Sequence, residues 1–206
     1  MEAPTGLRER KKQRTYQAIS HAAISLFLAR GFEEVSVVDV AAEAEVSKRT
    51  LFKYFPTKED LVLHVFADHE DEAARVVRAR RPNESPLAAL HAHFLAGLDR
   101  HDAATGLCDE QVVAQIYELL TSTPTLAARL LQYSARSESA LATALAETDD
   151  DPLRPRVTAA AIVAVQRTLA QDNQRRMTAG ESAQARHPAA VAEADQAFTL
   201  LRNGFH

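Results

Sequence analysis

The sequence predicts an all-α protein. The 206 residues are rich in Ala and Leu, include only 6 glycines and no tryptophan, and contain few β-branched runs that would read as strands. Capping residues and prolines also recur at intervals that suit helix boundaries. A chain of this length can form one domain, or a small domain joined to a larger one.

The composition is that of an ordinary globular protein, with 46% hydrophobic and 25% charged residues and a net charge of -4. We expect a cytoplasmic protein with no membrane contact, because no apolar run has the length of a membrane span or of a secretory signal. The single cysteine, Cys108, excludes an intramolecular disulfide. We interpret it as a small buried residue rather than a reactive thiol.

The first predicted helix covers residues 7–30. Its apolar residues recur at helical spacing and form one stripe, and Gly31 follows where a left-handed cap would end the helix. The stripe consists of Ile19, Ala22, Ala23, Leu26 and Phe27.

Two short helices joined by a tight turn are predicted next, at residues 36–44 and 47–54. Ser36 and Asp39 have the spacing of a capping box, and Ser47 is a second N-cap. Phe55-Pro56 ends the second helix, because proline disfavours α geometry in the residue before it. This is the outline of a helix-turn-helix motif.

Cations cluster on the second of these helices. We expect Leu51 and Phe55 to point inward. The side chains left facing solvent are Lys48, Arg49, Lys53 and Tyr54. A short exposed helix with such residues suits the major groove of DNA, where Lys and Arg pair with guanine edges. All five lysines lie at or before Lys58.

The rest of the chain is predicted to be helical as well. Thr57 and Asp60 form another capping box and open one long helix that ends near residues 81–82. Further helices are expected at residues 85–103, at 107–121, from 123 to the acidic break at 148–152, from there to about 177, and from 187 onward, with a loop at 180–186.

The segment SVVDVAAEAEVSKRTLFKYFPTKEDL, residues 36–61, resembles the DNA-binding signature of the TetR family of transcriptional regulators. The resemblance covers about residues 12–66. It implies a three-helix DNA-binding domain at 1–66 and a helical effector-binding and dimerisation domain at 67–206. It further implies a homodimeric repressor that binds double-stranded operator DNA and is released by a small-molecule effector, with no enzymatic activity and no cofactor.

The resemblance also implies roles for single residues. Lys48 and Arg49 match positions that usually face bases, and Lys53 is a further exposed cation. Positions that usually meet phosphate or sugar are matched by Ser36, Ser47, Thr50, Tyr54 and Lys58.

Three residues depart from the family pattern. Glu45 stands where glycine is common, so it must adopt a left-handed conformation or reshape the turn. Arg49 also replaces a common glycine and should press more directly on the groove. Phe52 replaces the usual tyrosine and lacks its hydroxyl group.

A basic run precedes this segment, and two interpretations of it stay open. It can lie along DNA or reach the minor groove, or it can be a solvated tail. The run consists of Arg8, Arg10, Lys11, Lys12 and Arg14.

The helices of the second domain are expected to enclose an apolar cavity for the effector. The same side chains can equally be plain core. The candidates are Phe66, Phe94, Leu98, Ile116, Tyr117, Leu120, Leu130, Tyr133 and Gln166. No metal site is expected, because the eight histidines include no pair spaced i, i+4.

The last two helices are expected to form the dimer surface, with packing inside the chain as the alternative. Small residues permit close approach of a partner helix, and the apolar residues of the last helix repeat at 3, 4, 3. The candidates are Ala161, Val165, Val191, Ala194, Phe198 and Leu201. Competing functions are a small helical enzyme that uses Cys108, and an adaptor whose basic segment binds protein or membrane.

Overall fold

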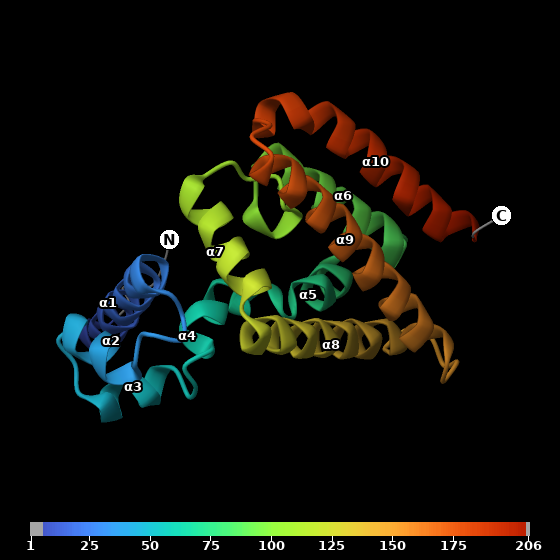
Figure 1. Ribbon diagram of the computed structural model, residues 1–206. Coiled ribbons are helices and arrows are strands. Elements are labelled where there is room, and N and C mark those ends of the chain that lie inside the picture. Colours follow the sequence, from blue (N-terminus) through green and yellow to red (C-terminus); the bar gives the residue numbers. More distant parts are fainter. Residues whose placement is uncertain (1–5, 205–206) are drawn as a thin grey trace. The chain divides into compact units, whose positions relative to one another are not determined.

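The computed structural model describes residues 6–204, except for the side chains of residues 66–68. The described residues form helices and no strand, which confirms the predicted all-α class (Figure 1). The α-helices are α1 (Leu7–Arg30), α2 (Val37–Glu43), α3 (Lys48–Tyr54), α4 (Asp60–Leu63), α5 (Glu72–Ala79), α6 (Pro86–Asp99), α7 (Gln111–Ser122), α8 (Pro124–Ala146), α9 (Arg154–Thr178) and α10 (Ala183–Asn203), and the 3-10 helices are η1 (His64–His69) and η2 (Ala103–Thr105).

The chain divides into two compact units. The first unit comprises the residues up to Val65 together with Gln115–Leu130, and the second comprises Phe66–Ala114 and the residues from Leu131 onward. Helices α7 and α8 therefore each contribute residues to both units.

The first unit is built on α1, which packs against α2 and α4. Ile19 and Phe27 of α1, Val40 of α2, Leu51 of α3 and Leu61 of α4 are almost completely buried and form its core. The predicted bounds of α1 are confirmed, and Gly31 follows it at a φ of 87°. Glycine suits this position because it adopts positive φ without a Cβ clash.

The prediction of one long helix over residues 57–81 is wrong. The capping box at its start forms as predicted, since the Thr57 amide donates to Asp60 Oδ2 at 3.0 Å and the Asp60 amide to Thr57 Oγ1 at 3.2 Å. The helix then tightens into η1 after Leu63, and α5 begins only at Glu72. The intervening sequence HVFADH contains residues with lower helix propensity than Ala or Leu, and short 3-10 segments commonly replace α geometry at helix ends.

The second unit has its core where α10 packs against α6 and α9 (Figure 1). The ring of Phe198 is fully buried there and stacks on His91 with 4.7 Å between ring centroids. The buried core residues of this unit are Ala74, Val77, Leu90, Phe94, Leu98, Leu107, Leu141, Ala144, Leu145, Ala159, Ile162, Met177, Ala183, Ala190, Ala194 and Phe198. Cys108 is also buried, as predicted.

Helix α10 begins earlier than predicted, so the expected loop at 180–186 is wrong from Ala183 onward. Ser182 is the N-cap, and its Oγ accepts from the Ala185 amide at 3.2 Å. Pro188 lies inside the helix rather than at its start. Burial of Arg186, which donates to Asp172 Oδ2 and to Glu193, holds this first turn in place.

Two other helix bounds also differ from the predictions. Helix α6 ends at Asp99 rather than near 103, because Asp102 caps the short helix η2 instead. Helix α7 starts at Gln111, four residues after the predicted 107. Within the part of the chain that the structure describes, none of the helices combines the length and the apolar content needed to cross a bilayer.

Candidate nucleic-acid interface

A capping box fixes the start of α2. The Asp39 amide donates to Ser36 Oγ at 3.2 Å, and the Ser36 amide donates to Asp39 Oδ2 at 2.8 Å. The Ser36 hydroxyl also donates to Asp39 Oδ2 at 2.7 Å, and this bond, followed by the one from the Ser36 amide, holds the pKa of Asp39 below its ordinary value. The box satisfies amides that would otherwise lack partners at the helix end, so the position of Ser36 is well defined.

The turn between α2 and α3 contains a left-handed residue, which is one of the two outcomes that the sequence left open. Glu45 has a φ of 53°. This conformation brings the Glu45 amide to Ala42 O at 3.1 Å and the Val46 amide to Ala41 O at 2.9 Å. The turn is therefore kept without glycine, at a cost in backbone strain of about 1–2 kcal/mol.

The inner face of α3 is anchored in the first unit. Leu51 has 0% and Phe55 has 2% of its surface exposed, and the Phe55 ring stacks on Tyr16 at a centroid distance of 4.9 Å. Ser47 caps the helix by accepting from the Thr50 amide at 3.1 Å. Packing and capping together fix a helix of 7 residues that is too short to be stable alone.

The outer face of α3 is exposed and basic. Lys48, Arg49 and Lys53 are exposed, whereas Thr50 and Tyr54 are half-buried. Phe52 is exposed as well, and the Nζ atom of Lys48 lies 5.8 Å from the centre of its ring. Arg49 and Lys53 lie on the face opposite Leu51, and Lys48 lies beside Phe52, so the three cations face solvent as the sequence predicts. The prediction that Tyr54 also faces solvent is only partly met, because its side chain is half-buried and packs near Tyr16.

Lys58 is held against aromatic rings. Its Nζ atom lies 4.3 Å from the ring centre of Phe32 and 5.9 Å from that of Phe27, and it donates to Glu33 O at 3.5 Å. Attraction between the cation and the ring faces keeps this half-buried side chain in place. The charge is thereby presented beside the loop that precedes α2.

The basic run lies on the first turns of α1 and is therefore helical rather than an extended tail. Its side chains are exposed, and Lys12 forms an ion pair with Glu9 at 3.5 Å. The members of the run are Arg8, Arg10, Lys11, Lys12 and Arg14. Contact of these residues with DNA stays a prediction.

His64 is a residue that the sequence analysis did not connect with α3. Its Nδ1 donates to Leu61 O at 3.0 Å and its Nε2 contacts the hydroxyl of Ser20. Its ring packs edge-on against Phe55 at 5.4 Å and against Tyr16 at 5.7 Å. Burial lowers the pKa of His64, so the neutral ring is favoured as part of the support beneath Phe55.

Comparison with known proteins identifies the chain. A family model described as "Bacterial regulatory proteins, tetR family" matches residues 19–65. The HTH-type transcriptional regulator TcmR of Streptomyces glaucescens is 33% identical over 172 residues, which are 81% of this chain and 76% of TcmR. The chain belongs to the tetR family of bacterial regulatory proteins. The HTH-type transcriptional regulator RutR of Escherichia coli K12 is a further relative, 34% identical over 95 residues, which cover 46% of this chain and 45% of RutR.

Solved structures show the same fold as this TetR-family chain. NalD of Pseudomonas aeruginosa superimposes with a TM-score of 0.59 over 91% of this chain and 96% of NalD, at 16% identity. FadR of Bacillus subtilis, solved with stearoyl-CoA, gives a TM-score of 0.51 over 93% of this chain and 100% of FadR, at 20% identity. The family match and the similarity to TcmR make the TetR-family protein a DNA-binding transcriptional regulator of the helix-turn-helix type. Members of this family bind operator DNA as dimers, bind small-molecule effectors and are normally not enzymes.

The candidate effector-binding residues of this TetR-family chain fall in both units. Ile116, Tyr117, Leu120 and Leu130 belong to the first unit, and the other described candidates belong to the second. Burial raises the pKa of the Tyr133 hydroxyl, so this group stays neutral and can serve as a hydrogen-bond donor. The buried candidates are Phe94, Leu98 and Leu120, the half-buried ones are Ile116, Tyr117, Leu130, Tyr133 and Gln166, and the side chain of Phe66 lies outside the described residues.

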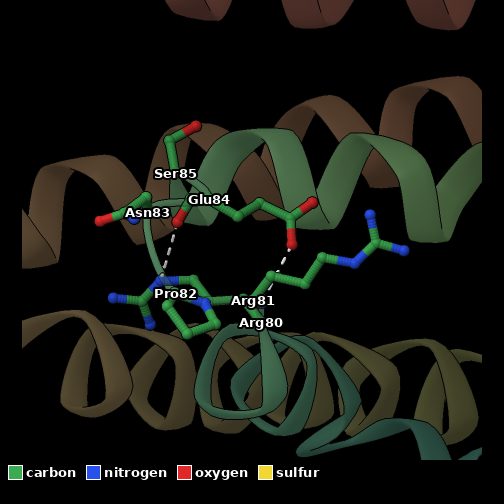
Figure 2. A pocket seen from close by; sticks show the side chains of 6 residues that line it. All are labelled: Arg80, Arg81, Pro82, Asn83, Glu84 and Ser85. Carbon is green, nitrogen blue, oxygen red and sulfur yellow. Dashed lines mark hydrogen bonds between the residues drawn. The ribbon is translucent and has the colours of Figure 1, made fainter.

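A cavity of about 450 Å³ lies at the connection between α5 and α6 (Figure 2). Arg80 Nε donates to Glu84 O at 3.1 Å, and the Arg81 amide donates to Glu84 Oε2 at 3.1 Å. These bonds tie the loop to itself across the cavity. The cavity is lined by Arg80, Arg81, Pro82, Asn83, Glu84 and Ser85, and it includes none of the residues that the sequence analysis proposed for the effector.

A carboxylate bridges two histidines in the second unit. Glu72 Oε2 accepts from His69 Nδ1 at 2.7 Å, and Glu72 Oε1 lies 3.1 Å from His93 Nε2. These hydrogen bonds, that of His69 first, hold the pKa of Glu72 well below its ordinary range. The histidines were expected to be ordinary surface or half-buried side chains rather than metal ligands, and nothing in their spacing indicated this shared partner.

The candidate dimer residues do not share one exposed face. Ala194 and Phe198 have 0% of their surface exposed, so they pack inside the second unit, while Ala161, Val165, Val191 and Leu201 are half-buried. The 3, 4, 3 spacing therefore marks the inward side of α10. The outward side of α10 carries an uncharged strip flanked by the exposed Asp195 and Arg202. The strip is formed by Ala185, Ala189, Ala192, Gln196, Thr199 and Leu200.

Proposed function

We propose that this TetR-family protein is a repressor that binds operator DNA as a homodimer through α3 and is released by a small-molecule effector. The observation that carries the proposal is the exposed, basic outer face of α3, supported from below by the buried side chains of Leu51 and Phe55. Rigid support matters because base-reading side chains must meet the groove in a fixed register.

The individual contacts follow from the chemistry of each side chain. Lys48 and Arg49 are long exposed donors and suit the O6 and N7 acceptors of guanine. Lys53 and Lys58 supply charge for phosphates, and the hydroxyl groups of Ser36, Ser47, Thr50 and Tyr54 are further phosphate donors.

The dimer is proposed to form through the outward sides of α9 and α10. Leu153, the N-cap of α9, and Val157 are 61% and 56% exposed, and the exposed Ala164, Thr168 and Arg175 follow on the same side of the helix. Together with the uncharged strip of α10, these residues form a surface that can be buried against a second copy about a two-fold axis.

Repression and release are supported by the similar structures. NalD, which has the same fold, is described as the secondary repressor of a multidrug efflux pump, and FadR was solved with an acyl-CoA molecule. The effector of the present chain does not follow from these structures, because sequence identities of 16% and 20% indicate a shared fold and not a shared ligand. The alternative of an enzyme that uses Cys108 is not favoured, because 6% of that residue is exposed.

A gel-shift titration on the DNA upstream of the protein's own gene tests the DNA-binding proposal. Retention should exceed that of competitor DNA, and log K should fall with log salt at a slope of about -0.9 for each neutralised phosphate.

Arg49→Ala should cost about 1–3 kcal/mol on the operator and relax one base position. Lys58→Ala should weaken binding to all DNA sequences alike. The matched control is Arg30→Ala, which removes an exposed cation at the end of α1. If Arg49→Ala binds each DNA sequence as tightly as the wild-type protein does, the base-reading role of Arg49 is refuted.

Sedimentation tests the dimer surface. Ala192→Glu places a charge on the outward side of α10 and should yield monomers that remain folded, because Ala192 is exposed. Gln184→Glu, at another exposed position of α10, is the matched control and should leave the dimer unchanged. A dimer of unchanged mass in Ala192→Glu would place the interface elsewhere.

A further inference from the structure

Phe52 is an aromatic residue that does not belong to the core. Its side chain is 38% exposed on the outer face of α3, whereas its neighbour Leu51 has 0% exposed. Three cations share the helix with it, at Lys48, Arg49 and Lys53, and the sequence of α3 contains no carboxylate. A large apolar ring surrounded by exposed positive charge suits a polyanionic partner that also offers an apolar contact.

The ring is held in a defined position. Lys48 and Phe52 are four residues apart and therefore lie on one side of the helix. The Lys48 Nζ atom is 5.8 Å from the ring centre, which permits a cation–π attraction. Phe52 therefore points toward the same partner as Lys48, and its orientation does not depend on that partner.

The chemistry of the ring limits what it can recognise. Phenylalanine has no donor or acceptor, so it cannot bond a phosphate as a tyrosine would, and it cannot pair with the polar edge of a base. The major groove offers one apolar group, the C5-methyl of thymine, and phenylalanine is among the side chains that contact it.

Because the proposed function places α3 in the major groove, we infer that Phe52 is a specificity-determining residue that packs on the C5-methyl group of a thymine in each half-site. The partner of the exposed Phe52 ring is thus an A·T pair, and Lys48 supplies positive charge beside the ring. Cytosine and uracil at that position lack the methyl group and leave the ring facing water.

Replacement of thymine by deoxyuridine tests this contact, because it removes the methyl group and keeps the base pair. The operator is first selected from a library of random duplexes, and each thymine is then replaced singly, with Kd measured by fluorescence anisotropy. At one thymine in each half-site, wild-type protein should bind the deoxyuridine duplex about fourfold more weakly, as expected for one buried methyl-sized group.

Variants assign that effect to Phe52. Phe52→Ala should bind thymine and deoxyuridine duplexes equally, whereas Phe52→Leu, which stays apolar, should keep part of the difference. Lys58→Ala is the matched control and should weaken both duplexes by the same factor. Melting curves of Phe52→Ala separate a loss of recognition from a loss of fold, because the side chain is 38% exposed and the rest of it is covered.

The outcomes separate this inference from the proposed function. If duplexes are selected but no thymine is sensitive, or if Phe52→Ala discriminates as wild type does, the role of Phe52 is overturned while the regulator remains. If no duplex is selected above background, DNA binding itself fails and the inference fails with it.

Discussion

Glu45→Gly should stabilise the protein, although most substitutions do the opposite. Glu45 has a φ of 53°, in the left-handed region where a side chain with a Cβ costs about 1–2 kcal/mol. Glycine removes that strain but gives the unfolded chain more freedom, which costs roughly 0.5–1 kcal/mol. The difference between the midpoints of these two ranges predicts a net gain of about 0.75 kcal/mol in the free energy of unfolding, within limits of about 0 and 1.5 kcal/mol.

Urea unfolding followed by circular dichroism at 222 nm measures this gain as a higher midpoint with an unchanged m-value. Ala42→Gly is the matched control, three residues away and exposed in α2, where φ is helical and glycine should cost about 1 kcal/mol. The two glycine substitutions must therefore have opposite signs. If Glu45→Gly lowers the midpoint as Ala42→Gly does, the turn is not strained and the reasoning fails.

The remaining predictions concern the second unit. Gly106→Ala should destabilise it by roughly 2–6 kcal/mol in urea unfolding, because backbone strain and an overpacked contact add together. Its φ is 72°, and a Cβ there would lie 1.9 Å from Ala170 O, whereas Gly180→Ala meets nothing within 4 Å and should cost only the strain, about 1–3 kcal/mol. Equal losses in the two variants would contradict the contact. The pKa of Glu72 is lower in the folded protein than the value of 4.5 expected in the unfolded chain. The ionised carboxylate therefore stabilises the fold fully above pH 4.5, and this contribution is lost as the pH falls below that value. Urea midpoints measured between pH 3 and 7 should show a shallower acid loss in Glu72→Gln, and an identical pH profile would disprove the role of this carboxylate.

Local signals in the sequence predict the helix-turn-helix segment well. The capping boxes at Ser36 and Thr57, the N-cap at Ser47 and the left-handed Glu45 all depend on residues within three or four positions of one another. Such short-range hydrogen bonds require a fixed number of residues between their partners, so the sequence alone is sufficient to find them.

Contacts between distant residues explain what the sequence did not predict. The 3, 4, 3 repeat that ends at Leu201 is the same whether α10 packs on a partner or on α6, and only the burial of Phe198 decides between them. Ser20 and His64 are 44 residues apart, and no periodicity connects them. The start of α10 similarly depends on Arg186, which was predicted to lie in a loop, and on its carboxylate partners Asp172 in α9 and Glu193 further along α10.

The inward residues and the N-cap hold α3 in place, so the proposed DNA sequence preference of its outward side can change without loss of the fold. Helix α3 has 7 residues, and isolated helices shorter than about 12–15 residues are marginal in water. Its stability must therefore come from Leu51, Phe55 and the cap at Ser47, all of which lie on the inward side or at its start. The side chains of Arg49 and Phe52 are exposed, so substitutions there are expected to alter the proposed contacts with DNA while the helix stays in place. DNA affinities of such variants can for this reason be compared directly, whereas variants of Leu51 would mix recognition with unfolding.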